Sequence, residues 1–259
     1  MSLKIKQISD GFKSKFEISD NTMLFVAVSG GCDSMVLLHA LKSVHNKITV
    51  AHVNYKLRGQ DSMNDANLVE RIAESHQLPF EKLDYDLQTE LNENGGNLQE
   101  KAREVRYLFF EQLVGKHKEA KLILAHHQGD QIENFWMQMA RGGGLRAMSG
   151  MKEINNNVIR PFLSISKDEI KSYALENSIE WREDLSNQKN TYTRNIWRNV
   201  LIPELTTINN QLDESVKLLQ GVFLRQVKDD QASIKKYSQH KENGFLFYFS
   251  EMKDLSSNQ

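Results

Sequence analysis

The sequence contains one cysteine, Cys32, and this scarcity excludes several kinds of chemistry. A single thiol cannot form a disulfide within the chain, a cysteine-ligated zinc site or an iron–sulfur cluster. The sequence also lacks an apolar run as long as a membrane span and an N-terminal segment typical of a signal peptide. We therefore expect a cytoplasmic protein that makes no contact with a membrane.

An excess of charge of either sign is also missing, since 33 lysines and arginines are balanced by 34 aspartates and glutamates. The formal net charge of −1 gives no overall positive field, so contacts with nucleic acid must come from local clusters of lysine and arginine. No internal repeat or low-complexity segment stands out. The 259 residues, 39% apolar and 26% charged, are typical of a globular domain with an appendage.

What the sequence does contain is a strand-length apolar run at residues 24–28, followed by Ser-Gly-Gly-Cys-Asp-Ser at residues 29–34 and an apolar helical pattern. This pattern predicts a buried strand, a tight turn and a helix. The glycines allow close approach to a ligand, and Asp33 or Ser34 could cap the helix, whose unpaired N–H groups suit a phosphate. An ordinary strand–turn–helix corner is the alternative. A Walker loop is excluded because no Gly-Lys-Ser/Thr follows.

Further strands and helices alternate along the chain. We expect strands at residues 47–54, 79–84, 120–126 and 158–160, and helices at residues 5–20, 64–76, 97–116, 130–141 and 167–177. Ser166 and Glu169 form a capping-box pattern at the start of the last helix. The alternation predicts an α/β fold with a doubly wound, parallel, five-stranded sheet covered by helices on both faces.

Polar segments directly follow three of the predicted strands, at residues 29–34, 54–59 and 126–134. In an open parallel sheet a ligand binds beyond the carboxyl ends of the strands, where the strand order reverses. We therefore expect these segments to meet at one edge of the sheet. His126 and His127 are neighbours, and neighbours point to opposite faces of a strand, so no zinc site is expected there.

Six later segments narrow the interpretation. They are HVNYKLRG at residues 52–59, AHHxxDQxE at 125–133, RGGGLR at 141–146, RPFL at 160–163, WREDxSN at 181–187 and YTRNxxR at 192–198. The loop at residues 29–34 resembles the Ser-Gly-Gly-x-Asp-Ser pyrophosphate loop of the ATP-pyrophosphatases, which adenylate a carbonyl oxygen. Loop and segments together resemble the tRNA(Ile)-lysidine synthetase family, from about residue 20 to residue 205.

The resemblance implies an adenine nucleotide alpha hydrolase-like fold and an ATP-dependent ligase. Such an enzyme adenylates the C2 carbonyl oxygen of the wobble cytidine in tRNA(Ile) with a CAU anticodon and releases pyrophosphate. The ε-amine of free lysine then displaces AMP to give lysidine. ATP, Mg²⁺, lysine and this tRNA are therefore the implied cofactors and partners. The oligomeric state stays open, a homodimer included.

The same resemblance implies ATP binding by eight residues: Ser29, Gly30, Gly31, Cys32, Asp33, Ser34, His52 and Asn54. Asp33 is the carboxylate best placed to hold Mg²⁺ and to act in catalysis, with a simple helix cap as the alternative. For His52 and Asn54, a structural role at the end of a strand is the alternative. Cys32 occupies the variable position of the loop, and we expect it to fill space.

Asp130 and Glu133 are the implied catalytic and lysine-binding carboxylates, and their spacing places them on one helix face. The attacking lysine must lose a proton, because its usual pKa is about 10.4, and a carboxylate can take it. Favourable placement of acids at a helix N-terminus is the alternative. The family pattern has a second Asp where Gly129 stands and Thr where Asn134 stands, so Asp130 must carry any role that the pair of acids shares.

Contacts with tRNA are implied for three pairs of arginines: Arg103 and Arg106, Arg141 and Arg146, and Arg194 and Arg198. A single arginine is usually a solvated surface charge, but three clusters around one site favour phosphate contacts. Residues 1–205 are predicted to form the ATP-pyrophosphatase domain. Residues 206–259 are predicted to hold a linker helix at 212–228, a strand at 244–249 and a partial or truncated tRNA-binding region, since one helix and one strand make no core alone.

Other enzymes and a protein without catalytic activity are the alternatives. Sulfur-transferring relatives need paired cysteines or cluster ligands, which a chain with one cysteine lacks. NAD synthetase and GMP synthetase share the loop but not the later segments. A nucleotide-binding or RNA-binding module without chemistry, degenerate because of Gly129, is the alternative from a different class.

Overall fold

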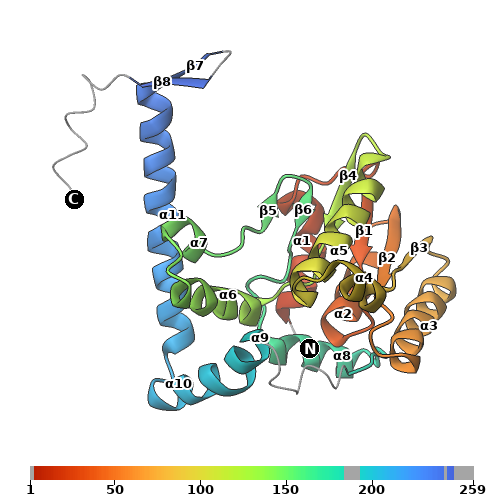
Figure 1. The fold of residues 1–259 in the computed structure, drawn as a ribbon. Helices are drawn as coiled ribbons and strands as arrows, with labels where there is room; N and C mark the ends of the chain where they lie inside the picture. The colour runs from red at the N-terminus through yellow and green to blue at the C-terminus, as the bar shows by residue number, and fades with distance from the viewer. Residues whose placement is uncertain (1–2, 184–192, 242–243, 248–259) are drawn as a thin grey trace. The chain divides into compact units, whose positions relative to one another are not determined.

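The computed structural model describes residues 3–183, 193–241 and 244–247 (Figure 1). Its contacts divide the chain into two compact units. The first unit contains Met1–Gln131 and Met151–Lys189, and the second contains Ile132–Gly150 and Asn190–Gln259. The predicted domain limits at residues 205 and 206 are not tested by this division and stay a prediction.

The first unit is built on a six-stranded sheet with the order β3-β2-β1-β4-β6-β5. The strands are β1 (Met23–Ala27), β2 (Ile48–Asn54), β3 (Phe80–Asp84), β4 (Ala120–Ile123), β5 (Ile154–Asn155) and β6 (Val158–Ile159). The five predicted strands are confirmed and pair in parallel, Leu24 with Ile48 and with Lys121 on its two sides.

The prediction of five strands was wrong by one, because β5 adds an antiparallel edge strand next to β6. The chain turns back between them at Asn156, which has a φ of 53°. Asparagine tolerates this left-handed conformation, so a tight hairpin forms between two-residue strands. Strands of this length give no readable alternation in the sequence.

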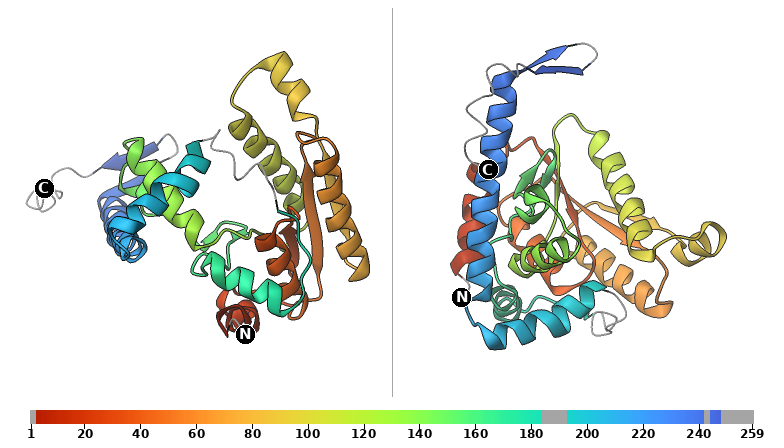
Figure 2. Two further views of the ribbon diagram at one scale, coloured as in Figure 1. Left: turned by 90° about the horizontal axis from the view of Figure 1, so that it is seen from below. Right: turned by 60° about the vertical axis from the view of Figure 1, so that its left-hand side comes forward.

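Helices cover both faces of this sheet, as predicted. They are α1 (Leu3–Lys15), α2 (Cys32–Lys42), α3 (Gln60–Ser75), α4 (Leu87–Asn94), α5 (Leu98–Gly115) and α8 (Lys167–Glu176). Leu24 and Val26 pack with buried residues of α1, α2 and α8, whereas Phe25 between them packs with Phe110 and other residues of α5. Alternate residues of one strand thus enter two cores. Figure 2 shows α1 and α8 side by side.

Two predicted helices of the first unit differ from the structure by several residues at one end, and one helix was missed. The helix predicted at residues 64–76 begins at Gln60, directly after Gly59 in a positive-φ conformation. The helix predicted at 5–20 ends at Lys15. Helix α4 was missed, although Asp86 caps it by accepting a hydrogen bond from the Thr89 N–H. The predicted capping box of Ser166 and Glu169 on α8 is confirmed.

The second unit is mainly helical. Helix α6 (Gln128–Ala140) lies largely in it, followed by α7 (Leu145–Met148), α9 (Thr193–Ile196), the π-helix η2 (Trp197–Leu201), α10 (Ile202–Ile208) and α11 (Leu212–Tyr237). Its small core contains Ile132, Phe135 and Val216. The strand predicted at 244–249 is half of an antiparallel hairpin, β7 (Ser238–Lys241) with β8 (Gly244–Phe247), and residues 248–249 lie outside the described residues. Among the described residues, no helix is long and apolar enough to cross a membrane.

Candidate functional site

The loop after β1 is held in shape by its own serines. The Ser34 hydroxyl donates to the Gly31 carbonyl at 2.9 Å and accepts from the Ser29 N–H at 3.1 Å. Gly30 has a φ of +89°, a conformation that favours glycine, and a Cβ there would lie 3.5 Å from Asp65 of α3. The loop is therefore a tight backbone turn whose shape requires glycine.

The cap of α2 differs from the prediction. Gly31 is the N-cap residue and makes no side-chain cap hydrogen bond, so neither Asp33 nor Ser34 caps this helix. Both belong to its first turn, where N–H groups have no partner within the helix. The N-terminus of α2 keeps the positive end of its dipole available to an anion, and the alternative role of Asp33 as a simple cap is wrong.

Asp33 instead forms an ion pair with Lys167, the first residue of α8. The Lys167 Nζ lies 2.6 Å from Asp33 Oδ1 and 2.7 Å from Oδ2. Lys167 was not predicted as a partner of Asp33, because 134 residues separate the two side chains in the sequence. A weak signal was present, since a lysine in the first turn of a helix is unfavourable for the dipole and calls for a compensating acid.

His127 lies between Asp33 and Asp130. Its Nε2 is 3.9 Å from Asp33 Oδ2 and 3.8 Å from Asp130 Oδ2. Its Nδ1 accepts a hydrogen bond from the Gly129 N–H at 3.0 Å, so the neutral ring carries its proton on Nε2, facing the two carboxylates. The strand order reverses between the neighbouring strands β1 and β4, and the segments that follow them bring these three side chains together, as predicted from the fold.

The lack of a side chain at Gly129 allows the His127 ring to lie where it does. A Cβ at residue 129 would lie 2.8 Å from His127 Cε1 and 3.2 Å from Nδ1. The glycine that stands here in place of the family's aspartate therefore leaves room for the His127 imidazole. The strand predicted at residues 120–126 was too long, because β4 ends at Ile123 and His126 lies beyond it.

His52 and Asn54 end β2 and are buried. His52 Nδ1 is 2.7 Å from the Val28 carbonyl, and burial lowers the pKa of His52, so the ring is neutral and donates from Nδ1. Asn54 donates to Asp84 at 2.9 Å and accepts from the Lys56 N–H at 3.0 Å. These contacts support a structural role for both residues, and contact with ATP stays a prediction.

Cys32 is buried at the start of α2. Burial raises the pKa of its thiol to about 11, so the thiolate that sulfur chemistry requires is disfavoured near neutral pH. This agrees with the expectation that Cys32 fills space.

Arg103 and Arg106 flank one aromatic ring on α5. Their guanidinium carbons lie 4.9 Å and 5.8 Å from the centroid of the Tyr107 ring. Cation–π contacts at such distances hold guanidinium groups in defined positions. The first unit thus presents two ordered cations on one helix.

Glu133 in the second unit is a buried carboxylate bound by two arginines. Arg194 Nε donates to Oε2 at 2.7 Å, and Arg198 donates to both oxygens, with Nη2 2.9 Å from Oε2. Glu133 is 3% exposed, whereas both arginine side chains are more than a third exposed. The acid therefore orients two cations toward the surface. Arg141 and Arg146 lie in the same unit and are exposed.

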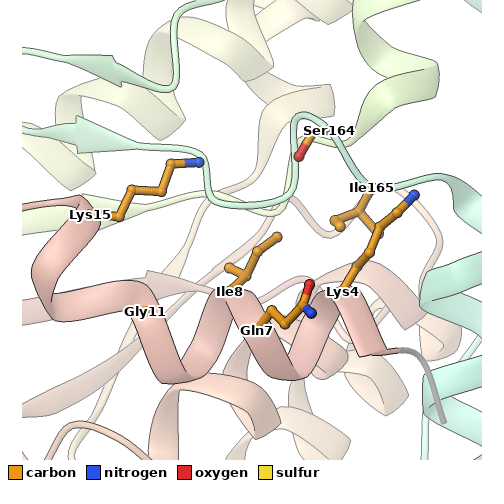
Figure 3. Close-up of a pocket in the computed structure, with 7 residues that line it drawn as sticks. All are labelled: Lys4, Gln7, Ile8, Gly11, Lys15, Ser164 and Ile165. Carbon is orange, nitrogen blue, oxygen red and sulfur yellow. The ribbon is translucent and has the colours of Figure 1, made fainter.

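A cavity of about 250 Å³ lies beside α1 and is also lined by Ser164 and Ile165 (Figure 3). Lys4 and Lys15 line it, but Lys4 pairs with Glu169 at 2.8 Å and Lys15 with Glu153 at 2.7 Å. Its cations are thus already neutralised. No predicted site residue lines it.

Few possible metal ligands surround Asp33, so a metal ion here would need most of its ligands from the substrate and from water. Within the described residues, no group of three or more His, Cys, Asp or Glu side chains could hold a metal ion. Mg²⁺ is usually bound by one or two carboxylates together with substrate phosphates and water. Asp33, with Asp130 near it, fits that pattern and does not fit a structural zinc site.

A parallel α/β sheet with a glycine loop leading to a helix N-terminus at its switch point defines a nucleotide-binding protein of the doubly wound class. More narrowly, the chain belongs to the PP-loop domain family, whose model matches residues 3–205. A solved structure of this fold is the U34-tRNA thiolase NcsA from Methanococcus maripaludis, with a TM-score of 0.70, 13% identity, and coverage of 86% of this chain and 80% of that one.

Curated relatives are more similar in sequence. The tRNA(Ile)-lysidine synthase of Bacillus subtilis is 37% identical over 209 residues, which are 78% of this chain and 44% of that protein. The tRNA(Ile)-lysidine synthase of Thermotoga maritima is 34% identical over 209 residues, 79% of this chain and 50% of that protein. The chain thus spans about half the length of the curated relatives it matches.

Proposed function

We propose that the protein is a tRNA(Ile)-lysidine synthetase. It would use ATP to attach lysine to C2 of the wobble cytidine in tRNA(Ile) with a CAU anticodon. The observation that carries this proposal is the loop at residues 29–34 with Asp33, His127 and Asp130 gathered at its edge. The identity to tRNA(Ile)-lysidine synthases over most of the chain supports this choice among PP-loop reactions. The proposal places the reaction in the cytoplasm.

The first step is adenylation of the cytidine. The C2 carbonyl oxygen attacks the α-phosphate of ATP, and the bond between the α- and β-phosphates breaks, so that pyrophosphate leaves. The N-terminus of α2, the loop N–H groups and the hydroxyls of Ser29 and Ser34 stabilise the negative charge on the leaving group. Asp33 would hold Mg²⁺, which when bound would neutralise part of that charge.

The second step forms the carbon–nitrogen bond. The ε-amine of lysine attacks C2, and the adenylate leaves as AMP because its phosphate stabilises the charge on the departing oxygen. Asp130 is assigned as the proton acceptor for the amine. Glu133 is assigned to positioning, since both of its oxygens already accept from Arg194 and Arg198. These two arginines then face the tRNA with Arg103, Arg106, Arg141 and Arg146.

The same proposal assigns ATP binding and tRNA binding to different parts of the chain. Residues 1–205 supply the ATP site, and residues 206–259 supply a linker helix and part of a tRNA-binding region. The long helix α11 and the β7–β8 hairpin give that region its described elements.

The test measures three products together: pyrophosphate, AMP and lysine bound to tRNA. We expect pyrophosphate release to require the tRNA and ATP, and AMP release and labelled lysine in tRNA to require lysine as well. A tRNA transcript with uridine at the wobble position is the matched control and stays unlabelled. If tRNA drives pyrophosphate release but lysine is never incorporated, the ligase is refuted. If ATP binds without any turnover, the module without chemistry is the correct interpretation.

A further inference from the structure

A network of charged side chains ties three separate segments of the first unit to the phosphate loop. At its centre is Asp65 of α3, which is 8% exposed. Arg182, after α8, donates from Nε to Asp65 Oδ1 at 2.7 Å, and Arg58, before α3, donates from Nη2 to Oδ2 at 2.7 Å. Arg182 also reaches Asp61 Oδ1 from Nη2 at 3.1 Å. One buried carboxylate thus anchors two arginines.

The network touches the loop through the backbone of Arg182. Its N–H donates to the Gly30 carbonyl at 3.0 Å. Gly30 also lies close to α3, since a Cβ there would lie 3.5 Å from both the Cβ and the carbonyl oxygen of Asp65. The segment that carries Arg182 and the helix that carries Asp65 therefore hold the same glycine.

This hydrogen bond sets the direction in which the loop presents its next N–H group. The Gly30 carbonyl and the Gly31 N–H belong to one peptide unit, and in a trans peptide the two bonds point in opposite directions. With the carbonyl turned toward Arg182, the Gly31 N–H points to the opposite side and donates to the Ser29 Oγ at 3.3 Å, a hydroxyl of the same loop. An N–H fixed in advance stabilises a phosphate better than one that must be ordered on binding.

We propose that Arg182 is a positioning residue for the phosphate loop, holding the Gly30–Gly31 peptide in the orientation that binds the pyrophosphate part of ATP. Asp65 and Asp61 fix the guanidinium, and the guanidinium fixes the backbone N–H that holds Gly30. This inference rests on the proposed function only in that the loop binds the phosphates of ATP. It is independent of the lysine-transfer step.

The variants are Arg182→Gln and Asp65→Asn, with Arg71→Gln as the matched control. Arg71 pairs with Glu180 at 2.6 Å, so the control also removes an ion pair between α3 and the segment before Arg182. Arg71 and Glu180 are both exposed, and none of the contacts described for Gly30 involves them. Binding of ATP, inorganic pyrophosphate and adenosine to the full chain is measured by calorimetry with Mg²⁺ present, and thermal unfolding is measured without ligand.

We expect Arg182→Gln and Asp65→Asn to weaken binding of ATP and pyrophosphate about tenfold, the loss expected for one charge-assisted hydrogen bond, and to leave adenosine binding unchanged. Arg182→Lys, which keeps a charge for Asp65, should restore part of the affinity. Arg71→Gln should bind all three ligands like the unaltered chain.

Equal pyrophosphate binding by Arg182→Gln and the unaltered chain would overturn the inference, whatever happens to the unfolding temperature. Equal losses for adenosine and pyrophosphate would overturn it too, because a purely structural role affects both. If the unaltered chain fails to bind ATP, this inference and the proposed function both fail. If it binds ATP but never transfers lysine, only the proposed reaction fails, and the variants still decide the role of Arg182.

Discussion

Replacing Gly129 with alanine adds one methyl group next to His127 in the first turn of α6. The new Cβ would lie 2.8 Å from His127 Cε1. Ordinary carbon–carbon contacts lie at about 3.5 Å, so the imidazole must move by about 0.7 Å. The ring is the outer end of a side chain and can move, so the cost appears in the geometry of the site more than in folding.

The magnitude follows from the bonds that the ring would lose. The hydrogen bond from the Gly129 N–H to Nδ1 fixes the proton on Nε2, between Asp33 and Asp130. A net loss of about 1 kcal/mol for this bond, together with misplaced groups in the site, predicts a fall of roughly tenfold in the rate of adenylation. Because Gly129 is the second residue of α6, alanine there gains less than the roughly 1 kcal/mol of a helix interior, so the unfolding temperature should change little.

The assay combines tRNA-dependent pyrophosphate release with thermal unfolding of the same samples. Gly11→Ala is the matched control, because Gly11 lies within α1 and a Cβ there meets nothing within 4 Å. We expect the control to raise the unfolding temperature and to leave the rate unchanged. An unchanged rate in Gly129→Ala would show that adenylation does not depend on where the His127 ring lies. A large loss of stability would show that the ring cannot move aside.

Two further predictions concern charge. Glu133→Gln leaves Arg194 and Arg198 around a neutral amide, so the free energy of unfolding should fall by about 2 kcal/mol in a denaturant titration. Glu214→Gln, which removes an exposed pair with Lys217, should cost under about 0.5 kcal/mol, and equal effects would contradict the buried pairing. Burial lowers the pKa of His52, so the unfolded chain binds more protons and stability should fall as pH drops below about 6.5. His52→Asn should flatten this fall in unfolding curves between about pH 5 and 7.5, and an equally steep fall in the variant would count against it.

Local patterns predicted most of the first unit because most of its elements have a signal within a short window of the sequence. The apolar runs gave the five strands, and the glycines gave the turn at residues 29–34. The missed elements have no such signal. Strand β5 is two residues long, and α4 depends on one capping aspartate, Asp86, in a sequence with few apolar residues.

Candidate site residues could be named before the structure was known, but the ion pairs that they form could not. Asp33, Asp130 and Glu133 were named through the likeness to a family, and their roles stay predictions. Lys167 and Arg182 were not named, because their partners lie 134 and 117 residues away. Ion pairs between residues so far apart depend on the order of the strands in the sheet and on the paths of the connecting helices. A single sequence predicts the strands but not that order. The likeness to a family adds residues that match its motif, and Lys167 lies in none of the matched segments.

The charges at the loop also explain why Asp33 belongs there. A carboxylate in the first turn of α2 repels a polyphosphate bound at the same helix N-terminus, unless a cation lies between them. Lys167 supplies one positive charge, in contact with both oxygens of Asp33. We therefore propose that Asp33 assists phosphate binding through the cations that it holds, and that the backbone N–H groups of the loop bind the anion. The orientation of those groups depends on Gly30, and through it on Arg182, a residue far from the loop in the sequence.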